Sequence, residues 1–145
     1  MNYTTQMDAA RKGILTKELL AVAKKEQMET EKLVKLVAAG QVVIPANKCH
    51  TCLDPNGIGS ALRTKINVNL GTSRDLNDLD MELQKVNDAV AMGAESIMDL
   101  SSFGDTQKFR RKLTAECPAI IGTVPIYDAV VYYQREKAKR ENTFY

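Results

Sequence analysis

The fold is decided by the segment Lys65-Ile-Asn-Val-Asn-Leu70 and by two similar apolar segments, Ser96-Ile-Met-Asp-Leu100 and Ile120-Ile-Gly-Thr-Val-Pro-Ile-Tyr127. Each segment has the character of a β-strand, and the stretches between them show helical periodicity. Strands that alternate with helices indicate a parallel sheet with crossover helices. We therefore expect an α/β fold in this part of the chain.

Three residues that close these segments, Asn69, Met98 and Tyr127, are spaced 29 residues apart. Ligands bind at the carboxyl ends of the strands in α/β sheets and barrels. Taken singly, Asn69 could form an Asx turn before Gly71, Met98 could fill a gap in the core, and Tyr127 could pack at a rim. Their equal spacing at equivalent places favours one shared binding site.

The first sixty residues are expected to form a helical region that ends in a loop. Thr16 is a suitable N-cap for a helix over 17–26, and Thr30 for a second helix over 31–39 that stops at Gly40. An extended segment at 42–44 then meets Pro45, and the loop 46–59 is rich in Asn, Pro and Gly.

Beyond this loop, a stripe at Leu76, Leu79, Leu83, Val86 and Val90 predicts a helix that ends before Gly93. A further helix is expected at about 106–116, with Phe109 and Leu113 on one side. We therefore divide the chain into 1–60, a helical region and loop, and 61–145, a set of strand–helix units. A closed barrel needs eight such units and typically about 250 residues, so a barrel would be less than half present.

The composition is that of one soluble domain: 145 residues, 44% hydrophobic and 26% charged. No run of eighteen apolar residues exists and the N-terminus lacks the features of an export signal, so we expect a cytoplasmic protein without a membrane partner. The net charge of +2 is too nearly balanced to drive nucleic-acid binding. The basic run at 135–140 is flanked or interrupted by acids, which favours a solvated helix face.

The cysteines are Cys49, Cys52 and Cys117. An odd number of cysteines without an export signal argues for reduced thiols. A metal or redox role for the run Cys49-His50-Thr51-Cys52 would need two further ligands, so incidental loop cysteines are favoured, with transient redox chemistry or adventitious zinc as the alternatives. We expect no metal site built from this chain alone.

Five ordered motifs carry a family resemblance that runs from about residue 4 to residue 133. The motifs are Thr5-Gln-Met7 with Ala10-Arg11, Ile44-Pro-Ala-Asn47, Lys65-Ile-Asn-Val-Asn-Leu-Gly71, Met98-Asp-Leu-Ser101 and Gly122-Thr-Val-Pro-Ile-Tyr127. They resemble the N-terminal third of the ThiC family of radical S-adenosylmethionine enzymes, the phosphomethylpyrimidine synthases. The resemblance implies a small N-terminal domain followed by a TIM-type (β/α) barrel, of which this chain would hold only the first strand–helix units.

The resemblance also implies a reaction and a substrate. In this family, a lyase, aminoimidazole ribotide is rearranged to hydroxymethylpyrimidine phosphate for thiamine; a [4Fe–4S] cluster reduces S-adenosylmethionine, and a deoxyadenosyl radical then abstracts hydrogen from the substrate. Asn69, Met98 and Tyr127 would contact that substrate. An amide can hydrogen-bond an imidazole nitrogen, a tyrosine hydroxyl can reach phosphate or ribose, and a thioether forms an apolar wall. The catalytic residues are not identified within this chain.

In the complete family, the cluster cysteines, the histidines that bind a divalent metal (zinc) and the later strands would all follow Tyr145. We therefore expect the chain not to be catalytically competent alone. A truncated gene, a piece of a longer chain and a split enzyme whose second polypeptide supplies the rest remain open. The complete family implies a homodimer.

One departure leaves the product open. Where members of the family read Asp-Leu-Ser-Thr-Gly-Gly, this chain reads Asp99-Leu-Ser-Ser-Phe-Gly104. A paralogue, hydroxybenzimidazole synthase, converts the same ribotide to the lower ligand of cobamides in anaerobes, and it is the alternative reading. A different class of function is a non-catalytic binding module that keeps a substrate half-site.

Overall fold

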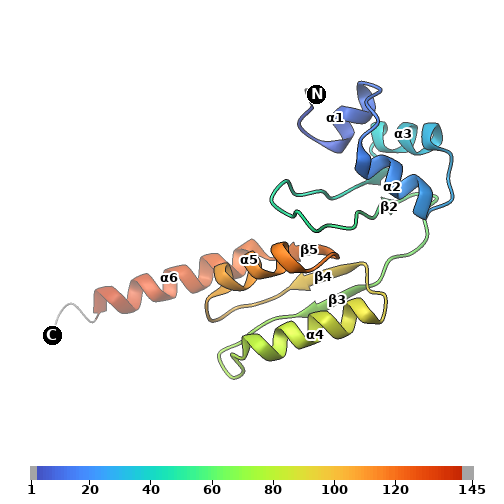
Figure 1. Cartoon of the computed structure of the whole chain (residues 1–145). Coiled ribbons are helices and arrows are strands. Elements are labelled where there is room, and N and C mark those ends of the chain that lie inside the picture. Colours follow the sequence, from blue (N-terminus) through green and yellow to red (C-terminus); the bar gives the residue numbers. More distant parts are fainter. Residues whose placement is uncertain (1–2, 142–145) are drawn as a thin grey trace.

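The computed structural model describes residues 3–141 of the chain (Figure 1). Three helices and a two-stranded ribbon come first, and strand–helix units follow. The elements are α1 (Gln6–Arg11), α2 (Lys17–Lys25), α3 (Thr30–Ala38), β1 (Val42–Val43), β2 (Ile58–Gly59), β3 (Asn67–Leu70), α4 (Leu79–Ala91), β4 (Ser96–Asp99), α5 (Thr106–Glu116), β5 (Ile120–Thr123) and α6 (Pro125–Glu141).

The N-terminal region packs α1, α2 and α3 on one side of the antiparallel β1–β2 ribbon around its own apolar core. The predicted cap of α2 is confirmed, because the Thr16 hydroxyl accepts a hydrogen bond of 3.1 Å from the backbone N–H of Leu19. The cap predicted at Thr30 is wrong, because α3 already begins at Thr30 and Glu29 precedes it without a capping bond. The left-handed stop at Gly40 is confirmed by its φ of +75°.

The second region is a parallel sheet in the order β3-β4-β5 with α4 and α5 packed on one face. This confirms the α/β class. α5 has the predicted bounds, whereas α4 begins at Leu79, so Leu76 lies in the preceding loop. The face toward the helices is apolar: Leu70 and Ile97 are buried there against Phe109.

The third strand is shorter than expected. β5 ends at Thr123, and α6 begins at Pro125, so the prediction that a strand runs on to Tyr127 is wrong. Proline suits the first turn of a helix, where its missing N–H would have no partner. Tyr127 accordingly lies in the first turn of α6, and its N–H donates to the Val124 carbonyl at 3.0 Å. α6 leads away from the sheet, unlike α4 and α5, which run back along it (Figure 1).

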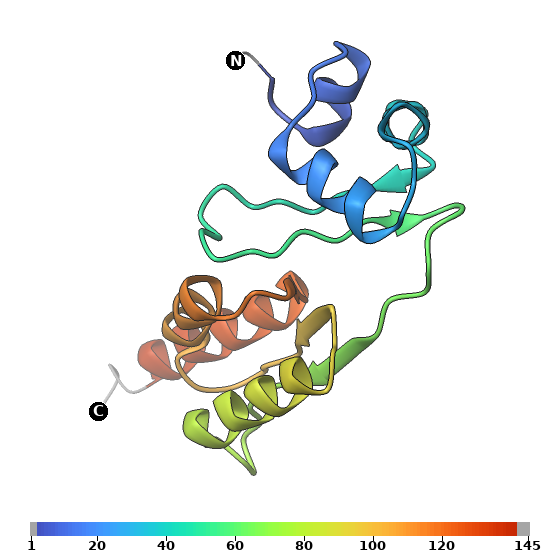
Figure 2. The same cartoon turned by 45° about the vertical axis from the view of Figure 1, so that its right-hand side comes forward.

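Two sets of contacts join the N-terminal region to the sheet region. The loop after β1 reaches toward the end of α5 (Figure 2), where the N–H of Asp54 donates to the Pro118 carbonyl at 2.9 Å. At the other junction, the buried Glu26 carboxylate pairs with the Lys65 ammonium and accepts a 3.0 Å bond from the Arg63 backbone N–H. Arg63 also pairs with Glu95, ahead of β4.

Acid is expected to weaken this junction. Burial alone would raise the pKa of Glu26, but the hydrogen bonds from Lys65 and Arg63 and their positive charges lower it overall. An unfolded glutamate has a pKa of about 4.3. The stabilisation is therefore complete above that pH and is lost as the pH falls through the lower pKa of the folded state. Urea unfolding should show a wild-type advantage over Glu26→Gln of about 1–2 kcal/mol at pH 7.

That advantage should shrink as the pH falls from neutral through the lower pKa of folded Glu26, because protonation makes the glutamate uncharged like the glutamine. A difference between wild type and Glu26→Gln that stays constant from pH 7 to pH 3 would contradict the assignment. Glu29→Gln is the matched control, since Glu29 precedes α3 without a capping bond; its unfolding free energy should differ little from wild type across this range.

No helix within residues 3–141 is both long enough and apolar enough to cross a bilayer. The basic run at 135–140 falls within α6. Most of its side chains lie outside the part of the chain that the structure describes, so the prediction of a solvated face there stays a prediction.

Candidate functional site

The site begins with a row of residues across the sheet. Asn69 of β3 is in register with Met98 of β4, and Met98 with Gly122 of β5. Because side chains alternate along a strand, the row lies on the face opposite the buried Leu70 and Ile97, away from the helices. Asn69 is exposed and Met98 is half-buried. The structure therefore brings together two of the three residues predicted as a site.

Gly122 is the part of this row that sequence reasoning missed. A Cβ atom built on Gly122 would lie 2.8 Å from Cε of Met98 and 2.9 Å from its sulfur. Because Gly122 has no side chain, the Met98 thioether has space to lie against it. Gly122 was visible in the third strand segment, but its role depends on the strand register, which a single sequence does not supply.

The loops at the carboxyl ends of β3 and β4 are locked to each other. The N–H of Thr72 donates to the Ser101 hydroxyl at 3.1 Å, and the N–H of Ser102 donates to the Thr72 carbonyl at 2.9 Å. Gly71 has a φ of +144° and lies against the backbone of Ser101. Its N–H donates at 2.8 Å to the fully buried Glu82 carboxylate. These bonds fix the positions of the strand ends that carry Asn69 and Met98 relative to each other.

Tyr127 stands apart from the row, because it comes from α6. The residue is 42% exposed and borders a cavity of about 230 Å³ at the carboxyl edge of the sheet. A guanidinium, two hydroxyls and an amide line this cavity, and such groups hydrogen-bond anions and polyols. The other lining residues are Arg74, Ser102, Phe103, Val130, Val131 and Gln134.

An ion cluster connects the end of β4 to the start of α6. Arg110 of α5 donates from Nε to the Asp99 carboxylate and from Nη1 to the Asp128 carboxylate, each at 2.6 Å. Asp99 is fully buried, and the Thr106 hydroxyl donates to Asp128 at 3.1 Å. Burial alone would lower the pKa of Arg110, but its bonds to Asp128 and Asp99 and their charges raise it overall, so the guanidinium stays charged.

The cysteines do not form a cofactor site in the part of the chain that is described. The Cys52 thiol lies 3.3 Å from the Cys117 carbonyl oxygen, and Nε2 of His50 lies 2.6 Å from the same oxygen. Burial raises the pKa of the Cys117 thiol, which disfavours the thiolate that a metal needs. Cys49 is exposed. Between residues 3 and 141, no three His, Cys, Asp or Glu side chains gather as metal ligands would, so the iron–sulfur cluster of a radical enzyme does not fit here.

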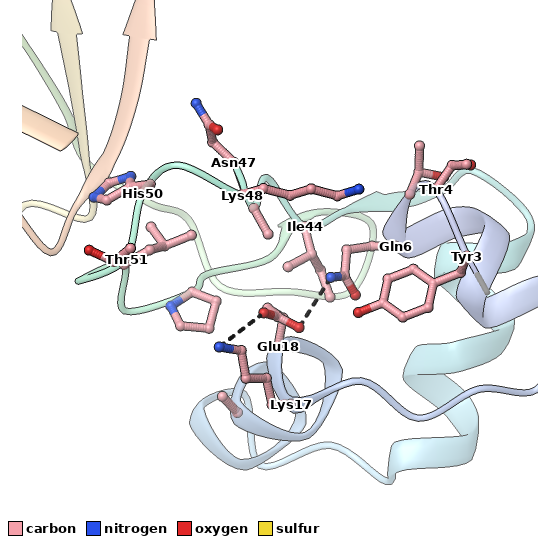
Figure 3. Close-up of a pocket in the computed structure, with 15 residues that line it drawn as sticks. Tyr3, Thr4, Gln6, Lys17, Glu18, Ile44, Asn47, Lys48, His50 and Thr51 are labelled. Carbon is pink, nitrogen blue, oxygen red and sulfur yellow. Dashed lines mark hydrogen bonds and ion pairs between the residues drawn. The ribbon is translucent and has the colours of Figure 1, made fainter. Parts of the chain in front are cut away.

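A second cavity, of about 880 Å³, lies in the N-terminal region between α1, α2 and the loop after β1 (Figure 3). Two of the five motifs that carry the family resemblance meet there, since Gln6 and Asn47 both line the cavity. The Gln6 amide accepts from the Thr16 hydroxyl at 2.6 Å and donates to the Glu18 carboxylate at 3.2 Å. The bonds of Gln6 tie the chain entering α1 to α2. None of the row residues borders this cavity.

Comparison with known proteins places the chain in one family. The model of the family described as "Radical SAM ThiC family" matches residues 5–144. The chain is 65% identical over 136 residues to a phosphomethylpyrimidine synthase of Clostridium botulinum (strain Okra / Type B1), and 62% identical over 136 residues to that of Clostridium novyi (strain NT). Each match covers 94% of this chain and 31% of the relative, so the chain spans about a third of the length of these curated relatives. The chain belongs to the radical SAM ThiC family.

Proposed function

We propose that the chain supplies one wall of the substrate pocket in an enzyme that converts aminoimidazole ribotide to hydroxymethylpyrimidine phosphate for thiamine. The observation that carries the proposal is the placement of Asn69 beside Met98, on the sheet face away from the helices and near the carboxyl ends of the strands. The relatives are named phosphomethylpyrimidine synthase. Their identity to this chain favours the pyrimidine product over the benzimidazole product of the paralogue.

The proposed pocket assigns each residue a task. The Asn69 amide is exposed and can bond an imidazole nitrogen or a ribose hydroxyl. The Met98 thioether, held over Gly122, provides an apolar surface beside it. The Tyr127 hydroxyl, at the edge cavity, would reach the ribose or the phosphate of the same ligand.

The sheet is proposed to be the start of a TIM-type barrel. Its strands follow sequence order, and α4 and α5 cover one face only, which supports a barrel whose inner face carries the row. The proposed division at residue 60 is supported by two separate apolar cores, one in the N-terminal region and one under the sheet.

Membership of a radical SAM family implies a [4Fe–4S] cluster and S-adenosylmethionine. Since the cysteines of this chain do not fit the cluster, we propose that its ligands, and those of a divalent metal such as zinc, come from residues beyond this chain. They would belong to the remaining two-thirds of the length that the relatives have, in a continuous chain, in a second polypeptide or in the partner of a homodimer.

The proposal is tested in a chimeric enzyme. In it, this chain replaces the matching 136 residues of the Clostridium botulinum relative, so that the pocket is completed by segments adapted to a 65% identical wall. We expect Asn69→Ala to weaken the binding of aminoimidazole ribotide by about 1–3 kcal/mol, the free energy of one or two hydrogen bonds to a buried ligand. Calorimetric titration measures the change directly.

Asn87→Ala is the matched control, because Asn87 is an exposed asparagine of α4 and therefore on the far side of the sheet from the row. It should leave the affinity unchanged. Equal affinities for wild type and Asn69→Ala would contradict the assignment of Asn69 to the substrate pocket.

A further inference from the structure

The ion cluster behind the sheet has a notable position relative to the proposed pocket. Asp99 directly follows Met98 in β4, and Asp128 directly follows Tyr127 in α6. A single guanidinium, that of Arg110, bonds both carboxylates. Met98 and Tyr127, which come from different elements, thus each precede an aspartate that the same guanidinium bonds.

The chemistry of the cluster suits a role in holding two segments at a fixed separation better than a role in stability alone. Arginine presents its donors in a rigid planar fork, so the carboxylates held by Nε and Nη1 have a fixed separation and orientation. The remaining nitrogen, Nη2, is buried and has no hydrogen-bond partner among the described residues. An unpaired buried donor is unfavourable, so the cluster is not optimised for stability alone.

The start of α6 is bonded to this cluster. α6 leads away from the sheet instead of packing back along it (Figure 1). Asp128, in its first turn, is bonded by two side chains of α5, Arg110 and Thr106. Asp99 is anchored independently, since its other oxygen accepts a 2.9 Å bond from the Ser101 N–H.

We propose that Arg110 is a positioning residue, whose guanidinium holds the segments that carry Met98 and Tyr127 at a set distance from each other and so sets the shape of the proposed substrate pocket. This inference rests on the proposed function for its substrate, aminoimidazole ribotide. Arg110 belongs to α5, on the face of the sheet opposite Asn69 and Met98, and acts through the two aspartates.

The first test needs no substrate. The chain is labelled with ¹³C at the methionine methyl groups and the tyrosine rings, and NMR follows Met98 and Tyr127. Arg110→Gln is expected to shift both resonances. Arg111→Gln, an exposed neighbour on the same helix, should shift neither. Asp128→Asn, which removes only the arm toward α6, should shift Tyr127 and leave Met98 in place.

Arg110→Lys separates position from charge, because one ammonium can pair with one carboxylate but cannot span both. It should retain one of the two wild-type resonances and not the other. Unchanged resonances of both residues in Arg110→Gln would overturn the inference. If Arg110→Gln does not fold, the Asp128→Asn variant provides the test. An unshifted Tyr127 resonance in Asp128→Asn would then overturn the inference.

The second test uses the chimeric enzyme and calorimetric titration with aminoimidazole ribotide. Arg110→Gln and Asp128→Asn should weaken binding at least tenfold, and Arg111→Gln less than twofold. Wild-type affinity in Asp128→Asn would overturn the inference while leaving the proposed function intact. Failure of the unmodified chimera to bind the ribotide would contradict the proposed function, and the substrate-free resonances would still decide the role of Arg110.

Discussion

Gly71→Ala is expected to lower the free energy of unfolding by about 3–5 kcal/mol and to move the two strand ends that carry the site apart. Gly71 has a φ of +144°, a backbone conformation that side chains rarely adopt. A Cβ atom there would lie 2.8 Å from the Leu100 carbonyl carbon and would press on the Ser101 nitrogen. These are backbone atoms of the neighbouring strand end, so no flexible side chain can yield to the new methyl group.

The control for Gly71→Ala is Gly93→Ala. Gly93 follows α4 with a φ of +92°, and apart from the adjoining chain no atom lies within 4 Å of the position its Cβ would take. This control carries the conformational cost without the clash and should lower stability by about 1–2 kcal/mol. Urea unfolding of the two variants measures the difference. Equal losses would show that the close approach of the two loops is not as tight as described.

The same contact joins the carboxyl ends of β3 and β4. The Leu100 N–H donates to the Leu70 carbonyl at 2.7 Å, and Gly71 leaves room for this approach. Asn69 and Met98 precede this contact by one and two residues. Their register is therefore set by backbone bonds at the carboxyl edge as well as by the ladder of the sheet.

Local patterns predicted much of this fold because they depend on residues close in sequence. α5 has its predicted bounds, since Phe109 and Leu113 share one face and Pro118 follows. The cap at Thr16 and the stop at Gly40 follow from similarly local chemistry. The site row was predicted in part: equal positions in successive strands placed Asn69 beside Met98.

Tyr127 shows where that reasoning failed. Its spacing from Met98 repeats the spacing between Met98 and Asn69, but the partner of Met98 in β5 is Gly122. Pro125 suits both the end of a strand and the first turn of a helix. The sequence therefore does not distinguish a long third strand from a short strand followed by α6.

The polar contacts behind the site depend on tertiary packing and left no local signal. Arg110 lies on the charged side of an amphipathic helix, which typically faces solvent, yet it is bonded to a buried aspartate. Cys52 and Cys117 lie 65 residues apart in sequence, and only the docking of the loop on α5 brings that thiol to the carbonyl. Their spacing gave no reason to expect them to meet.

Asp99→Ala is expected to be the most damaging change to the ion cluster. Removing one partner of a buried pair leaves the other charge uncompensated, at a cost of about 3–5 kcal/mol. Asp99 is fully buried. Its removal leaves Nε of Arg110 and the Ser101 N–H without the carboxylate that accepts their hydrogen bonds. Since the Arg110 side chain is 20% exposed and keeps Asp128, we expect the lower part of that range.

Asp128→Ala separates the two arms of the cluster. Its side chain is 34% exposed, so the Arg110–Asp128 pair is partly screened by water and should contribute about 1 kcal/mol. In urea unfolding, Asp99→Ala should therefore have a clearly lower free energy of unfolding than Asp128→Ala, although the two bonds to Arg110 have the same length. Equal losses of unfolding free energy would mean that burial does not distinguish the Arg110–Asp99 bond from the Arg110–Asp128 bond. The expected ranking makes Asp99 the anchor that holds Arg110 against the sheet, and Asp128 the arm by which Arg110 places α6 and Tyr127.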